Sequence, residues 1–347
     1  MAEALVLSTC FQCPKVCSVL GNIQILRFAA ATLVVLFHVA WTAQNEGRST
    51  SFLAHFIKWG ESGVDIFFVI SGFVMVLSQA RTRRSLGQFL LERAIRIVPM
   101  YWILTLLLTA LLLALPQLFS NSSFSASKTL ASLFFVNWLS GEGFPVVYVG
   151  WTLEYEWLFY IFFAFSFSLL PLELTWIPVL ASFSLLSASG WIEWVSVEFV
   201  YGMGIGLFYL RGWKLPFPSL FVIIGMAMLI GTALFQVAEL PRPVAYGVPA
   251  FLIVAGLVYL PQLRGRAVLF LGAASYSIYL VQVFTIPVAF RVIQKFVSLP
   301  SDVVALLAAA ITLLAGGLAC SLVEKPLGRR LHRLHRPEPQ MEIGVRS

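Results

Sequence analysis

Long hydrophobic runs, separated by short polar segments, extend over almost the whole chain. Ten of these runs have about the 20 residues that a helix needs to cross a bilayer. They lie near 24–42, 62–79, 98–116, 150–170, 172–189, 193–210, 216–236, 244–260, 267–290 and 302–323. The division between the fourth and fifth runs is open, because the region around Pro171 can be cut differently. The pattern predicts an all-α fold, a polytopic membrane helical bundle of about ten transmembrane helices.

No internal repeat or low-complexity segment divides these runs, so they predict one membrane domain. We place it at 22–331, after an N-terminal extension, 1–21, and before a basic tail, 332–347. The extension carries three cysteines whose spacing resembles a metal or redox site only loosely, namely Cys10, Cys13 and Cys17. The remaining cysteine, Cys320, lies in a distant apolar run and does not complete such a site. We therefore expect no bound metal.

The composition supports a membrane protein, because 59% of the 347 residues are hydrophobic, 11% are charged and the mean hydropathy is +0.89. The net charge is +7, but the basic residues cluster in short loops and near the C-terminus. That distribution is typical of membrane orientation and not of nucleic-acid binding. With the N-terminus inside, basic residues in inner loops outnumber those in outer loops by better than two to one. We expect cytoplasmic termini, lipid around the helices, and a multi-pass location in the inner (plasma) membrane.

Ionisable side chains inside the hydrophobic runs indicate a functional site, because burying them in a bilayer is costly. The first run contains Arg27 and His38, which share one helical face roughly 16 Å apart. In the expected topology, Asp65 in the second run and Glu156 in the fourth lie at the depth of His38. We predict a catalytic centre of these three residues, with one carboxylate orienting the imidazole. The alternatives are a hydrogen-bonded neutral histidine, a helix cap by Asp65, and Arg27 reaching the inner headgroups.

A second basic feature precedes the third hydrophobic run, in the segment RTRRSLGQFLLERAIRIVPMYW. Its Arg93 and Arg96 are three residues apart and therefore neighbours on one helical face. Paired guanidinium groups suit phosphate oxygens, so we predict a phosphate-binding site for a donor. The alternative is an ordinary cluster of charges that fixes membrane orientation.

Polar and aromatic residues near the other runs are candidate substrate contacts. In SYSIYLVQ, three residues have helical spacing and can line a polar cavity or make packing hydrogen bonds: Ser275, Tyr279 and Gln282. Near the outer surface, Trp151 can stack on a sugar ring or belong to the interfacial aromatic belt. We include Trp151, Tyr279 and Gln282 as substrate-binding candidates.

The chain resembles the acyltransferase-3 family in six motifs that occur in the family's order. They are an arginine and a histidine separated by ten residues, GVDIFFVISGF, R-AI-R, W-TLEYE-W-LFY, SYSIYL and VEKPLGRRL. The resemblance to these integral-membrane acyltransferases covers about 22–331 and is greatest for members that acetylate bacterial exopolysaccharides. It implies transfer of a short acyl group, usually acetyl, from cytoplasmic acetyl-CoA to a hydroxyl of an external glycan. Acetyl-CoA is then a co-substrate, and no permanently bound cofactor is expected.

The resemblance also implies roles for individual residues. Arg27 and His38 correspond to functional residues of the family, Arg93 and Arg96 to donor handling, and Glu156 to the glutamate of the W-x-L-x-x-E pattern. Many relatives have a histidine where this chain has Gln282, which argues against proton transfer at that position. We therefore expect His38 to act as general base, with Arg27 along the donor path. A covalent acyl-histidine remains an alternative.

A transporter or exporter of a glycan or small solute is the other function that buried histidine, arginine and glutamate side chains indicate. Transporters commonly have inverted repeats or paired broken helices, and this sequence shows neither. Cleavage of a thioester would distinguish the enzyme, because a carrier does not release CoA.

Overall fold

The computed structural model describes residues 20–48, 50, 53, 59–119, 124–235, 240–296 and 299–334. In these ranges every regular element is a helix. The first half contains α3 (Leu20–Asn45), α5 (Ser62–Arg81), α6 (Leu86–Ala114), α7 (Ala126–Leu133), α8 (Asn137–Ser140) and α9 (Trp151–Leu169). The second half contains α10 (Trp176–Ala188), α11 (Glu198–Leu210), α12 (Pro218–Phe235), α13 (Val248–Tyr259), α14 (Arg266–Phe296), α15 (Ser301–Ala319) and α16 (Lys325–Leu334). The cysteine-containing segment of the N-terminal extension, with Cys10, Cys13 and Cys17, lies outside the described residues.

Short 3₁₀ and π turns adjoin several of these helices. They are η2 (Pro116–Leu118), η3 (Tyr148–Gly150), η4 (Leu172–Leu174), η5 (Trp194–Val197), η6 (Pro243–Gly247) and η7 (Cys320–Glu324). With them, a helical segment covers each of the ten predicted hydrophobic runs. Six helices within the described ranges are long and apolar enough to cross a membrane: Gly21–Asn45, Ser62–Arg81, Leu86–Ala114, Pro218–Phe235, Arg266–Phe296 and Ser301–Leu334. The structure is thus a membrane-type helical bundle, while ten crossings and cytoplasmic termini stay predictions.

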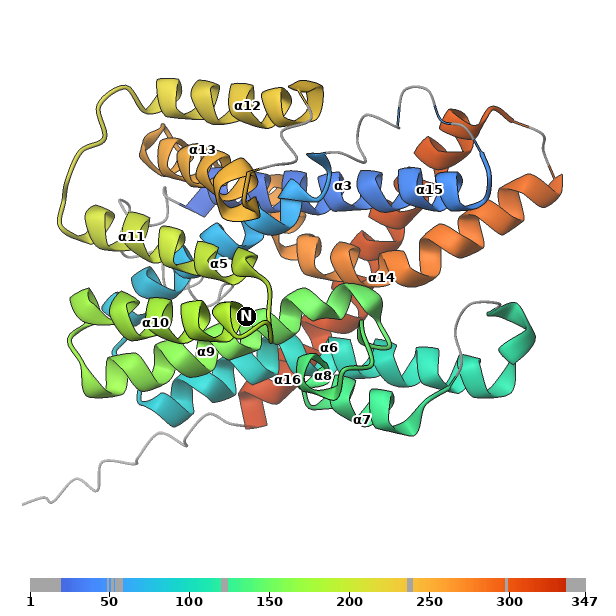
Figure 1. Cartoon of the computed structure of the whole chain (residues 1–347), viewed down its shortest axis with the longest axis horizontal. Coiled ribbons are helices and arrows are strands. Elements are labelled where there is room, and N and C mark those ends of the chain that lie inside the picture. The colour runs from blue at the N-terminus through green and yellow to red at the C-terminus, as the bar shows by residue number, and fades with distance from the viewer. Residues whose placement is uncertain are drawn as a thin grey trace, which may run out of the picture.

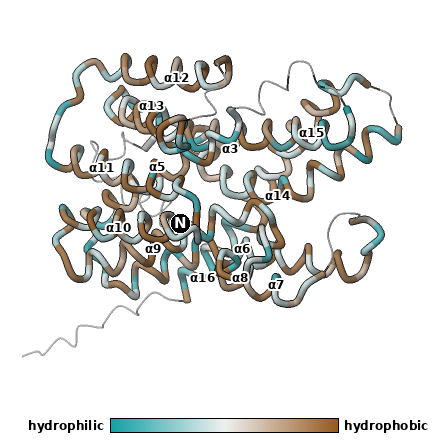
Figure 2. The backbone as a smooth tube through the Cα atoms, viewed as in Figure 1, coloured by the Kyte–Doolittle hydropathy of each residue, from teal (hydrophilic) through white to brown (hydrophobic). Residues whose placement is uncertain are grey.

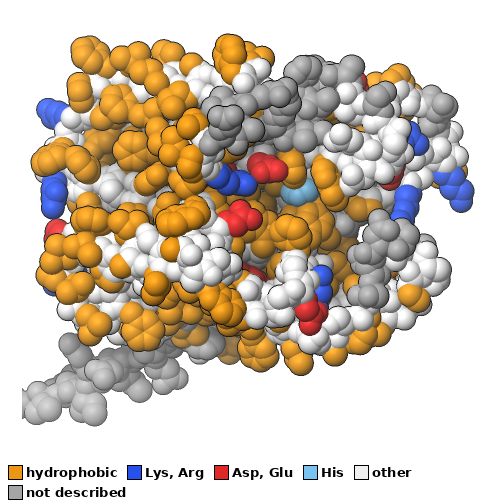
Figure 3. All heavy atoms as spheres, viewed as in Figure 1, with side chains coloured by type: hydrophobic (Ala, Val, Ile, Leu, Met, Phe, Trp, Pro, Cys, Tyr) orange, Lys and Arg blue, Asp and Glu red, His pale blue; other side chains and the backbone are white. Residues whose placement is uncertain are grey.

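The helices pack into one bundle in which segments distant in sequence are neighbours (Figure 1). α3 packs against α5, α14 and α15, and α5 packs against α11. Hydrophobic residues dominate most helices along their length (Figure 2). Many large apolar side chains are also exposed, as expected of surfaces that face lipid. On one face, charged side chains and a histidine lie together near the centre of a mainly hydrophobic surface (Figure 3).

Two glycines allow α5 and α11 to approach closely, which fixes the position of the α5 residues around Ser71. A Cβ atom on Gly72 would lie 1.9 Å from the Phe199 carbonyl oxygen, and one on Gly202 would lie 1.9 Å from that of Val69. Because the obstructing atoms are backbone atoms, no side-chain rotation would relieve such a contact. The SGF sequence of the second run is therefore a close-packing motif of the kind common between membrane helices.

The start of α6 explains why its arginines lie on a helix. Ser85 accepts a hydrogen bond from the Gln88 backbone N–H, and the Gln88 side chain accepts one from the Ser85 backbone N–H. This capping box begins the helix well before the predicted hydrophobic run. Arg93 and Arg96 consequently lie on a regular helix and face the same side of it, as their spacing predicts.

Candidate active site

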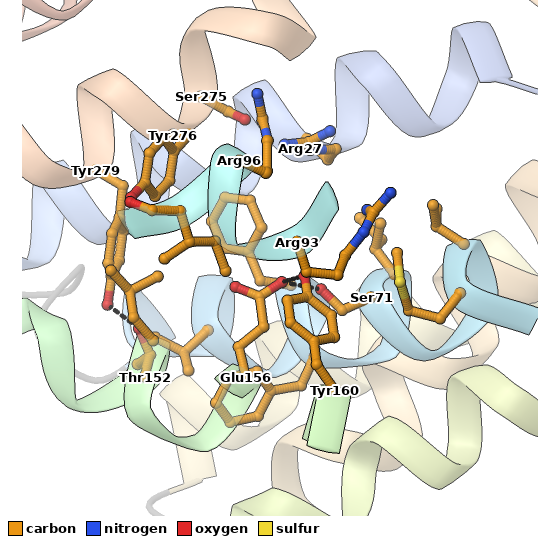
Figure 4. A pocket seen from close by; sticks show the side chains of 18 residues that line it. Arg27, Ser71, Arg93, Arg96, Thr152, Glu156, Tyr160, Ser275, Tyr276 and Tyr279 are labelled. Atoms are coloured by element: carbon orange, nitrogen blue, oxygen red, sulfur yellow. Dashed lines mark hydrogen bonds between the residues drawn. The ribbon is translucent and has the colours of Figure 1, made fainter. Parts of the chain in front are cut away.

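A polar cavity lies inside the bundle, between α3, α5, α6, α9 and α14 (Figure 4). Its empty volume is about 790 Å³, a figure that includes open space at its mouth. Its polar and charged lining residues are Arg27, Ser71, Arg93, Arg96, Thr152, Glu156, Tyr160, Ser275, Tyr276 and Tyr279. The fold therefore brings together, from distant parts of the chain, several residues that the sequence analysis predicts as site residues.

Three arginines give the cavity a strongly positive end. Arg27 comes from α3, and Arg93 and Arg96 come from α6. The Arg93 side chain is buried, its guanidinium lies 5.7 Å from the Phe89 ring centroid, and its Nε has no hydrogen-bond partner. Guanidinium groups gathered in a low-dielectric cavity favour a ligand with several negative charges, such as one with phosphate groups.

The carboxylate of Glu156 lies in the same cavity as the arginines. Its Oε1 accepts hydrogen bonds from Ser71 Oγ at 3.0 Å and from the Tyr160 hydroxyl at 2.5 Å. Tyr160 is one turn further along α9, so its position relative to Glu156 is set by the helix. Among the described contacts, none joins Glu156 to His38. The expected role of Glu156 in orienting the imidazole therefore gains no support from the geometry.

The aromatic end of the cavity is formed by Tyr279 and Thr152, on the side away from the arginines (Figure 4). The Tyr279 hydroxyl lies 2.7 Å from Thr152 Oγ1 and 2.9 Å from the Val149 carbonyl oxygen. The Phe67 ring meets Tyr279 edge to face, with 6.1 Å between ring centroids. Trp151, by contrast, is not part of the lining and packs on Phe68 and Tyr155.

His38 is not part of the cavity lining and has a defined tautomer. Its Nδ1 is 2.9 Å from the Val34 carbonyl oxygen, and because a carbonyl can only accept, Nδ1 carries the hydrogen. In the neutral ring Nε2 is then unprotonated and can accept a proton. The ring is 5.1 Å from that of Tyr148, measured between centroids, and also interacts with the Gln282 side chain.

Gln282, the polar neighbour of His38, is one of the residues predicted from the sequence to bind substrate. It is fully buried, its Nε2 donates to the Tyr279 carbonyl oxygen at 2.7 Å, and its Oε1 lacks a well-aligned partner. A buried amide oxygen without a partner is costly. Its place beside the His38 ring gives it a natural partner once that ring is protonated.

Asp65 pairs with Arg242, and none of the described contacts joins it to His38. Both of its oxygens accept from Arg242, at 3.2 Å from Nε and 3.0 Å from Nη2. Arg242 also contacts Glu61 at 3.0 Å, and the buried Glu198 lies next to Asp65. A buried carboxylate needs a countercharge, and Arg242 supplies it from 177 residues away.

A second nearby carboxylate, Glu154, has a structural role. Its two oxygens accept the backbone N–H groups of Asn137 and Trp138, each at 3.1 Å. It thereby ties the start of α8 to α9. Glu154 and Glu156 point to different sides of α9, and of the two only Glu156 lines the cavity.

The described part of the chain thus forms a membrane helical protein with a positively charged internal cavity. A family model described as "Acyltransferase domain" matches residues 20–323. The chain belongs to this acyltransferase-3 family of membrane acyltransferases, as its motifs indicate.

Three curated proteins resemble the chain over most of their length. The exopolysaccharide production protein ExoZ of Rhizobium meliloti is 37% identical over 299 residues, covering 80% of this chain and 92% of the relative. Acyltransferase MdmB of Streptomyces mycarofaciens is 25% identical, covering 90% and 94%. The putative membrane-bound transacylase BcsY of Komagataeibacter xylinus is 26% identical, covering 75% and 71%. No solved structure matches the chain.

Proposed function

We propose that the protein transfers an acetyl or other short acyl group from cytoplasmic acyl-CoA, usually acetyl-CoA, to a hydroxyl of an extracytoplasmic glycan. The acceptor would be an exopolysaccharide or its lipid-linked precursor, in line with the name of the relative, exopolysaccharide production protein ExoZ. The observation that carries the proposal is the convergence of Arg27, Arg93 and Arg96 in one cavity. Tyr279, which also lines this cavity, is hydrogen-bonded to Gln282, the neighbour of His38. Under the positive-inside rule this cavity opens to the cytoplasm, and the protein lies in the inner membrane.

In this mechanism the arginines bind the phosphates of CoA, and the pantetheine arm extends toward Thr152 and Tyr279. The arm spans on the order of 15–20 Å, the axial distance over which Arg27 and His38 are separated. Glu156 accepts two hydrogen bonds within the site and so is held where it can meet polar groups of the arm.

The chemical step is a direct acyl transfer. His38 Nε2 takes the proton of the acceptor hydroxyl while the hydroxyl oxygen attacks the thioester carbonyl carbon. The carbon–sulfur bond breaks, and the proton passes from His38 to the departing thiolate, giving the ester and free CoA. The Gln282 side chain, which lies beside the ring, stabilises the transient imidazolium without a carboxylate.

The test is acetyl transfer by purified protein, followed as CoA release and as mass of the glycan. His38→Ala should abolish transfer while the protein still inserts and folds, and His332→Ala, outside the cavity, serves as the matched control. Near-normal acetylation by His38→Ala would overturn the role of His38. An unmodified protein that moves glycan across vesicles without releasing CoA would instead establish a transporter.

A further inference from the structure

The C-terminal helix contributes an acidic residue to the edge of the cavity. α15 passes through the π turn η7 before continuing as α16. A π turn inserts one residue into a helix, so the side chains that follow are rotated by about 100° relative to a regular helix. Such turns are frequent at functional sites. Here the turn ends at Glu324, whose carboxylate meets α6 and α14.

Both oxygens of Glu324 are engaged. Oε1 lies 2.7 Å from Nη1 of Arg96, and Oε2 accepts a hydrogen bond from Ser277 Oγ at 2.5 Å. The Glu324 side chain is 10% exposed and that of Arg96 is 21% exposed, so the pair is largely shielded from water. The Arg96 guanidinium also lies 5.4 Å from the Tyr276 ring centroid. One cavity arginine is therefore oriented by groups from α14 and from the C-terminal segment.

The second arginine of the cavity on α6 is held differently. Arg93 lies 3.7 Å from Glu92, a neighbour in its own helix, and its Nε has no partner. The ion pair of Arg96 is shorter and connects elements 228 residues apart. Such a tertiary contact fixes a long side chain before a ligand arrives, which lowers the entropy lost on binding.

We propose that Glu324 is a positioning residue of the donor site, which orients the Arg96 guanidinium for the phosphates of the acyl-CoA. Ser277 holds Glu324, Glu324 holds Nη1 of Arg96, and the planar guanidinium presents another edge to the cavity. This inference rests on the proposed function, because it assumes that Arg96 binds the donor.

The test uses the full chain purified in detergent and titrated with acetyl-CoA by calorimetry. Glu324→Gln keeps an oxygen for Ser277 but removes the charge, so the dissociation constant should rise about three- to tenfold, the factor for ordering one long side chain on binding. Ser277→Ala should act in the same direction with a smaller effect. Glu173→Gln, an exposed carboxylate in η4 outside the cavity lining, should leave affinity unchanged. Thermal unfolding of each variant separates loss of affinity from loss of fold.

A double-mutant cycle with Arg96→Gln makes the assignment specific. Once Arg96 is replaced, adding Glu324→Gln should change acetyl-CoA affinity no further. If Arg96→Gln weakens binding but Glu324→Gln does not, the positioning role is refuted and the donor site stands. Tighter binding by Glu324→Gln would mean that the carboxylate competes with the donor, which also refutes it. If Arg96→Gln itself leaves affinity unchanged, the proposed donor site fails.

Discussion

Arg242 neutralises a group of acidic side chains where the starts of α5, η6 and α11 meet. It contacts Asp65 and Glu61 directly, and the buried Glu198 lies beside Asp65. In such an arrangement the loss of the cation leaves buried carboxylates without a countercharge. Arg242 therefore has a structural role that is separate from the cavity, and Asp65 is part of the same structural group.

Arg242→Leu should lower the free energy of unfolding by about 3–5 kcal/mol, the usual cost of breaking a buried pair by removing one partner. Denaturant unfolding in detergent measures this value. Arg242→Lys keeps the charge and should lower the free energy of unfolding much less. A leucine variant as stable as the unmodified protein would contradict the structural role.

Gln282 is the residue for which the sequence and the structure lead to different roles. Gln282→Leu should lower kcat about tenfold or more, because a hydrogen bond to a charged group contributes about 1.5–3 kcal/mol. The KM for acetyl-CoA should change little, since Gln282 does not line the cavity. Steady-state kinetics separates the two constants, with Gln294→Leu on the same helix as the control. A change confined to the KM of the glycan would restore the predicted substrate-binding role.

Charged residues in hydrophobic runs are readily found from the sequence, which is why Arg27 and Glu156 were predicted, and the three-residue spacing indicated Arg93 and Arg96. The sequence grouped Glu156 with His38 and Asp65, however, whereas the structure places it in one cavity with the three arginines. Hydroxyl groups such as that of Tyr160 carry no comparable signal, because tyrosine is common in membrane helices. The pairing of Asp65 with Arg242 could not be predicted from the sequence either. Helical periodicity relates residues a few turns apart, whereas this pair depends on how distant helices pack.

At the scale of elements, the crossing of α5 and α11 is the contact on which one cavity wall depends. Gly72→Ala or Gly202→Ala places a Cβ 1.9 Å from a backbone oxygen. Either substitution should therefore lower the free energy of unfolding by at least about 1–3 kcal/mol, the usual cost of overpacking. Gly204→Ala on the same α11 meets open space and should be tolerated. Thermal unfolding of the three variants tests the contact, and equal stability of all three would contradict it.

The positions of the helices were more accessible to sequence analysis than their membrane status. Hydrophobic length predicts the segments because lipid requires each backbone group to be bonded within the helix. Several of them, such as Trp194–Leu210 and Pro243–Tyr259, are nevertheless short for a full crossing. Whether a short apolar helix spans the bilayer depends on its neighbours and on local bilayer thickness, which the hydrophobic pattern does not contain.

At the scale of the whole molecule, the predicted orientation can be tested with single cysteines in a background without the native ones. Ser140→Cys and Ser189→Cys should react with a membrane-impermeant maleimide on intact cells. Both positions are exposed, and in the ten-helix topology Ser140 falls in an outer loop and Ser189 at the outer end of the fifth run. Thr82→Cys should react only after permeabilisation. Labelling of Ser189→Cys from the inside alone would require fewer crossings between α9 and α11.

The edge-to-face contact of Phe67 and Tyr279 has a consequence for the cell as well as for the reaction. A passage wide enough for a pantetheine arm would also conduct small ions if it stayed open across the bilayer. Both rings line the cavity, and His38 does not. An aromatic pair that parted only for an arriving donor would keep the membrane electrically insulated between turnovers.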